Sequence, residues 1–157
     1  MNESERNRLM NELRRMIFAQ SDMAQAAMAA QSLITEHHNG DLCRALETAI
    51  AVCYARSFAG GNNAGTLGEE WFPEGGDQRA MHEAIVALRD EVFAHNDRTH
   101  YRGIVDAGAL LGEPEVFAEE WLPIKREVLP AFIQMCAYQQ TRFRIRGQEL
   151  QQQLAAR

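Results

Sequence analysis

One long run without proline or glycine constrains the fold of this chain more than any other feature. From about Glu3 to His38, apolar residues recur at three- and four-residue spacing, which predicts a single amphipathic helix. At about 1.5 Å per residue this helix would be roughly 50 Å long. Its middle, residues 24–30, is rich in alanine and methionine, which suits close approach of a second helix. Asn39 and Gly40 then supply the left-handed conformation that ends a helix.

Three further helices are predicted by the same periodicity. They cover about 42–59, 77–95 and 122–154, and Pro130 should bend the last one or displace its start. The glycine-rich loop 60–75 and an irregular stretch over 96–114 connect them, with a short extended piece around 104–105. The prediction is therefore an all-α, four-helix up-and-down bundle with long irregular connections. It forms one domain over 1–157, with a polar tail at 148–157 that is expected to fray.

The charge of the chain limits its contacts with nucleic acid. Sixteen Lys and Arg residues stand against 22 Asp and Glu residues, a net charge of −6. Nonspecific affinity for polyphosphates rests on clustered cations, so any RNA contact has to be local. Lys125 is the only lysine, and the positive charge is almost all guanidinium, which chelates phosphate through paired hydrogen bonds. A genome rich in G and C, or a habit of the protein surface, is the favoured explanation of this bias.

Cysteine usage and hydropathy indicate a cytoplasmic protein. Cys43, Cys53 and Cys136 are widely spaced, with no C-x-x-C pair for zinc or redox chemistry. The segment up to Arg15 is charged and lacks the apolar core of a signal peptide. No apolar stretch approaches the roughly 20 residues of a membrane span, so no membrane association is expected.

The segment 88–97, LRDEVFAHND, carries the candidate chemistry. Near the end of the third predicted helix it sets Arg89, the adjacent acid Asp90 and, six positions on, His95. Cations at the end of a helix are also favoured by its dipole, by about 0.3–1 kcal/mol, so a purely structural role is the alternative.

This segment resembles the signature of the HEPN superfamily, an Arg, a polar residue and then a His after a short gap. The leucine before the Arg and the Ala-His-Asn-Asp at the end are most similar to the abortive-infection, U-type branch. The resemblance implies a helical bundle with the motif at the end of its third helix and a homodimer that pairs two motifs. It also implies a metal-independent endoribonuclease, a toxin in a defence or toxin–antitoxin system. Some such toxins carry a tyrosine two residues after the His. Here that position is Asp97, so the chain departs from the family pattern at this residue.

The residue types suit RNA cleavage without a metal or cofactor. His95 titrates near neutrality and can move protons, Arg89 can stabilise the phosphorane charge, and Asp90 can orient either group. On a continuous helix, Arg89 and His95 would lie about 240° and 9 Å apart, so pairing across two protomers favours convergence. A substrate-binding mouth is predicted at the residues that follow the motif, namely Asn96, Arg98, His100, Tyr101 and Arg102.

Two other functions remain open at this stage. A non-catalytic HEPN-like module would use the same residues to bind RNA or protein, with a homodimer and a cognate antitoxin as partners. A plain bundle would bind a small molecule in a cleft under the 60–75 loop. A bundle metal site is not expected, because Glu91 and His95 lack the Glu-x-x-His spacing and no second pair exists.

Overall fold

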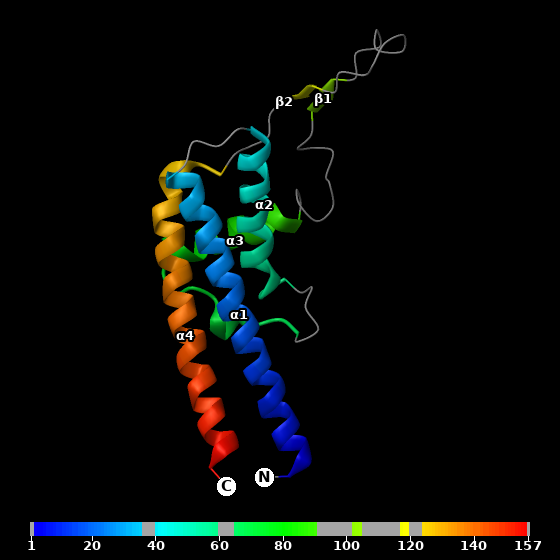
Figure 1. Cartoon of the computed structure of the whole chain (residues 1–157), viewed down its shortest axis with the longest axis vertical. Helices are drawn as coiled ribbons and strands as arrows, with labels where there is room; N and C mark the ends of the chain where they lie inside the picture. The colour runs from blue at the N-terminus through cyan, green and yellow to red at the C-terminus, as the bar shows by residue number, and fades with distance from the viewer. Residues whose placement is uncertain are drawn as a thin grey trace.

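The chain forms a bundle of four helices that alternate in direction. A computed structural model describes residues 2–35, 40–59, 65–90, 102–104, 117–119 and 124–156. The helices are α1 (Glu3–Thr35), α2 (Gly40–Arg56), α3 (Gly76–Leu88) and α4 (Leu129–Ala155), with short 3₁₀ turns η1 (Glu69–Trp71) and η4 (Arg126–Val128). Figure 1 shows α1 rising from the N-terminus, α2 descending beside it and α4 descending to the C-terminus. The predicted all-α bundle is confirmed.

A small antiparallel ribbon is the exception to the helical content of the described residues. Strands β1 (Arg102–Ile104) and β2 (Phe117–Glu119) pair so that Arg102 lies opposite Glu119. The sequence predicted a short extended piece around 104–105, and β1 ends at the first of these positions. Six residues of sheet add no layer to the bundle.

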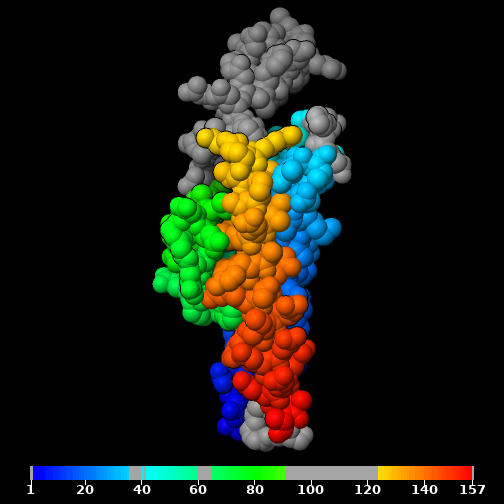
Figure 2. Space-filling model, turned by 90° about the vertical axis from the view of Figure 1, so that its left-hand side faces the viewer, coloured from blue at the N-terminus to red at the C-terminus, as the bar shows by residue number. Residues whose placement is uncertain are grey.

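Helices α1 and α4 form the long axis of the molecule. They run antiparallel, so the two chain ends lie next to each other, and α2 and α3 cover the half of the pair that is farther from those ends (Figure 1). Figure 2, seen from the α4 side, places α3 on one flank of α4 and α1 on the other. The largest fully buried apolar side chains of the core are Tyr54, Phe132, Phe143, Met16, Met23, Ile50, Leu129, Met135 and Leu150.

Local sequence explains where α4 begins and ends. Pro130 sits in its first turn, where the missing N–H group has no partner to lose, so the helix starts at Leu129 rather than near 122. This is the displaced start that the proline predicted. The polar stretch from Gln148 onward is helical to Ala155, because Leu150 inserts into the contact with α1 and is fully buried.

Aromatic contacts and one arginine hold the described part of the loop, 65–75, onto the bundle. Trp71 packs against Phe143, and Phe72 packs against Phe58, with ring centroids 5.4 and 5.6 Å apart. Arg142 of α4 donates hydrogen bonds to the carbonyl oxygens of Glu70, Trp71 and Phe72, at 2.8, 3.3 and 3.3 Å. Three loop carbonyls therefore find their hydrogen-bond donor on α4, while the N–H groups of Leu67, Trp71 and Phe72 bond to the carbonyl of Ser57 and to carbonyls within the loop.

Replacing Arg142 with methionine is expected to lower the free energy of unfolding by about 2 kcal/mol, because methionine keeps the apolar stem but leaves loop carbonyls without their charged donor. Urea unfolding followed by circular dichroism measures the difference. Arg144→Met is the matched control, since Arg144 is exposed and lies about 200° around α4 from Arg142. Equal effects of the two substitutions would contradict the role given to Arg142.

Candidate functional site

Arg89 and Asp90 lie where regular helical geometry ends in α3. The α-helix stops at Leu88, and the N–H of Arg89 is shared between the carbonyls of Ile85 and Val86. Residues 89 and 90 then form a wider, π-type turn. Such turns are uncommon and occur frequently at functional sites. The sequence predicted a helix as far as about His95; the α-helix gives way to this turn after Leu88, and residues 91–95 lie outside the described part of the chain.

The two side chains form an ion pair with each other. Nη1 of Arg89 lies 2.5 Å from Oδ1 of Asp90, and the side chains are 21% and 45% exposed respectively. The guanidinium is thus half-buried, oriented by its neighbour and still reachable from solvent. A charge-assisted pair of this kind holds the arginine in one direction but neutralises part of its charge.

The remaining predicted site residues fall largely outside the described part of the chain. His95, Asn96, Arg98, His100 and Tyr101 all lie between residues 91 and 101, which the structure does not describe. Arg102 is the first residue of β1. The structure therefore brings together Arg89 and Asp90, and the convergence of Arg89 with His95 stays a prediction.

An apolar pocket of about 280 Å³ adjoins the end of α3. It lies between α2, α3 and the start of α4, and its lining is Ile50, Met81, Ala84, Ile85, Leu88, Ile124, Val128 and Phe132. The small-molecule cleft was predicted under the 60–75 loop instead. A hollow of about 230 Å³ does lie there, but charged side chains share its wall: Glu12, Arg15 and Glu70.

A buried polar pair in the core was missed by sequence reasoning. The Tyr54 hydroxyl lies 3.0 Å from Nδ1 of His82 and 3.7 Å from Sδ of Met135. Burial, followed by the nearby charge of Arg79, lowers the pKa of His82 to about 4, and burial raises the pKa of Tyr54. His82 is therefore neutral at pH 7 and serves the core. Its position three residues before Ile85 on the buried stripe of α3 was the available signal.

A second buried polar cluster joins α1 to the end of α2. Asp22 forms an ion pair with Arg56 at 2.9 Å and accepts a hydrogen bond from the Ser57 hydroxyl at 3.2 Å. Burial raises the pKa of Asp22, while the Arg56 charge opposes that effect. Arg56 and Tyr54 of α2 thus both have partners within the fold, Asp22 and His82 respectively.

Comparison with known proteins identifies no relative of this chain. No family model, curated protein or solved structure matches the chain. Within the described ranges, no three His, Cys, Asp or Glu side chains are grouped as metal ligands, and no helix there is long and apolar enough to span a membrane. The case for a function rests on the residues themselves.

Proposed function

We propose that this protein is a HEPN-like, metal-independent endoribonuclease of a defence or toxin–antitoxin system. The observation that carries the proposal is the position of Arg89 and Asp90 at the end of the third helix of a four-helix bundle, followed in sequence by His95. Resemblance to the HEPN signature implies the motif at this point of the fold. The guanidinium of Arg89, 21% exposed and oriented by Asp90, suits contact with a phosphate.

Each motif residue has a role in this mechanism. Arg89 stabilises the negative charge of the pentacoordinate phosphate, and His95 exchanges protons with the 2′-hydroxyl and the leaving 5′-oxygen. Asp90 orients Arg89, as its ion pair with that side chain supports. The RNA strand lies along Asn96, Arg98, His100, Tyr101 and Arg102. Two motifs meet in a homodimer, and a cognate antitoxin restrains the activity.

A non-catalytic interaction module is the second candidate, and the Arg89–Asp90 ion pair is the observation that favours it. The guanidinium of Arg89 already donates a hydrogen bond from Nη1 to the carboxylate of Asp90, the next residue in the chain. A phosphate would have to compete with Asp90 for that charge. In this case the same residues hold a partner rather than cleave RNA.

Incubation of a mixed RNA pool with the purified chain in EDTA tests the nuclease proposal. We expect the wild type to cut, and Arg89→Ala and His95→Ala to lose at least about 100-fold in rate, the usual scale for one charge-stabilising or proton-transferring group. Arg79→Ala is the matched control, because Arg79 lies on the same helix and is bound to Glu83 instead. It should keep the wild-type rate.

Two outcomes would contradict the nuclease proposal. The first is a wild type that leaves every RNA intact, and the second is equal cutting by the wild type and both motif variants. RNA binding that needs Arg89 but produces no cleavage would favour the interaction module. Circular dichroism of each variant confirms that a lost activity is not a lost fold.

A further inference from the structure

The outer face of the α1–α4 pair lacks the charges that exposed helices normally carry. Between Met16 and Thr35 of α1 the one charged residue is Asp22, which is buried against Arg56 of α2. Between Leu129 and Thr141 of α4 there is none. A helix that borders solvent usually bears charged side chains on its outer side. This chain has 24% charged residues overall, so the depletion is local.

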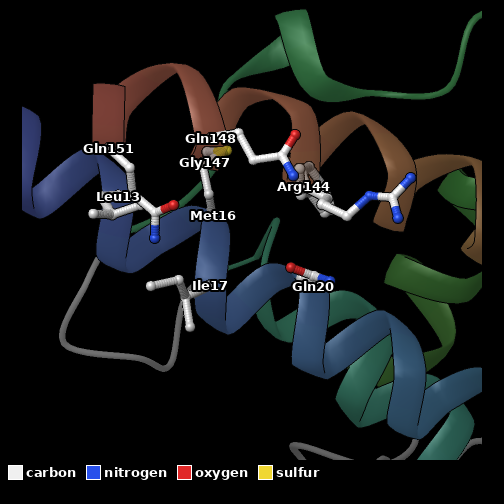
Figure 3. A pocket seen from close by; sticks show the side chains of 9 residues that line it. Leu13, Met16, Ile17, Gln20, Arg144, Gly147, Gln148 and Gln151 are labelled. Carbon is white, nitrogen blue, oxygen red and sulfur yellow. The ribbon is translucent and has the colours of Figure 1, made fainter. Parts of the chain in front are cut away.

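This uncharged region is a defined surface, which we call the α1–α4 face. Two adjoining hollows run along it and share Gln20 and Arg144. Figure 3 shows the first hollow between the two helices, with Ile17 and Gln20 on α1 and Arg144 and Gln148 on α4. The α1–α4 face comprises the outward residues Ile17, Gln20, Ala24, Ala27, Met28, Ala137, Gln140, Thr141, Arg144 and Gln148.

Apolar side chains are exposed on this face. Met28 is 72% exposed and Ile17 is 52% exposed. Alanine at positions 24, 27 and 137 keeps the surface between them low, so another helix pair can approach closely. Depletion of charge together with exposed methionine and aliphatic groups distinguishes the centre of a protein interface from ordinary surface.

We propose that the α1–α4 face binds the same face of a second copy of the chain. Each copy carries a net charge of −6, so two copies repel wherever acidic side chains meet. The α1–α4 face exposes no acid, and Arg144 is its one charged side chain. A basic partner would find no counter-charge there, whereas a second copy of the face brings no acid and a single guanidinium, that of Arg144, to the contact.

The size of the face suits a weak dimer, because it is smaller than the roughly 800 Å² per partner of a standard interface. The face covers twelve residues of each helix, about 18 Å, and two helices side by side are about 20 Å wide, which gives roughly 360 Å² before the relief of the side chains is counted. The two antiparallel helices also suit a two-fold axis normal to the face, which would stack two helix pairs into a four-helix contact.

This contact goes beyond the proposed nuclease, because it lies on the side of the bundle away from Arg89. Helix α3 packs on the opposite flank of α4 from α1 (Figure 2). Two copies joined through their α1–α4 faces therefore keep their Arg89 side chains apart. The pairing of motifs that the nuclease needs is a separate contact, and disrupting one leaves the other intact.

Sedimentation equilibrium of the full chain tests the α1–α4 contact. We expect wild-type assemblies at about 100 µM to have twice the mass of those of Met28→Arg or Ala137→Arg, with dissociation constants raised at least tenfold by either substitution. Both positions are exposed, so an added charge leaves the fold of one copy intact. Ala80→Arg on the exposed side of α3 is the matched control and should behave as the wild type.

The two proposals are tested by different measurements, assembly mass for the α1–α4 contact and RNA cleavage for the nuclease. A wild type that stays monomeric at this concentration overturns the α1–α4 contact, and so does an assembly that Ala80→Arg weakens as much as Met28→Arg. The second result leaves the nuclease proposal untouched, because RNA cleavage is measured on Arg89 and His95, whereas a monomeric wild type would also count against the paired motifs that the nuclease needs. A nuclease that fails while Met28→Arg halves the mass would remove the proposed function and keep the contact.

Discussion

Replacing Phe132 with alanine is expected to lower the free energy of unfolding by about 3–5 kcal/mol, the usual cost of emptying a buried aromatic site. Phe132 is 1% exposed, and its ring meets that of Tyr54 edge-on, with centroids 5.4 Å apart. It also lines the 280 Å³ apolar pocket at the end of α3. The space left by the ring would join this pocket, so the core has little means of closing it.

Chemical unfolding in guanidinium, followed by far-ultraviolet circular dichroism, measures this loss. Tyr138→Ala is the control, because Tyr138 is an aromatic residue on the same helix that is 46% exposed. We expect it to cost less than about 1 kcal/mol, since an exposed ring buries little area. Similar losses for the two variants would mean that Phe132 is not in the cooperative core.

Acid is expected to destabilise the protein through His82, by about 2 kcal/mol between pH 7 and pH 5 and about 3 kcal/mol by pH 4. The folded-state pKa of His82 is about 4, below the 6.5 of an unperturbed histidine. Between pH 6.5 and about pH 4, His82 therefore binds a proton in the unfolded chain and stays neutral in the folded chain. The stability is complete above pH 6.5 and is lost as the pH falls toward the folded-state value.

A His82→Gln variant isolates this contribution, because glutamine offers a polar group to Tyr54 but does not titrate in this range. We expect its midpoint in urea to be lower than that of the wild type at pH 7 and to fall less steeply toward pH 5. Carboxylates titrate in both proteins and cancel in the difference. Parallel pH profiles for the two proteins would show that His82 is not protonated on unfolding.

The sequence was sufficient for the helical framework because that framework depends on repeating patterns. The apolar period of α1, the glycine-rich loop and the effect of Pro130 on α4 are each local signals that the packing reinforces. The role of Arg142 was harder to see, because its partners are backbone carbonyls 70 to 72 positions away. Sequence patterns describe the faces of helices and say little about which loop carbonyls a side chain will meet.

The candidate site was predictable only as a motif. Arg89 and Asp90 lie where the signature implies, but the π-type turn that ends α3 has no marker in the residues themselves. The ion pair between these neighbours also depends on a rotamer choice that sequence does not record. For His82, the position on the buried side of α3 is predictable from the helical period. Its partner Tyr54 is not, because it comes from another helix.

Pairing of the first helix with the last has a consequence for how the chain folds. The Arg146–Glu12 bond joins residues 134 positions apart, and the whole contact between α1 and α4 closes a loop of nearly the full chain. Helical bundles fold fast when their contacts are local, whereas loop-closure entropy delays distant ones. We therefore expect slower folding than in a bundle of sequential neighbours. The two termini should come together late, after α2 and α3 have docked.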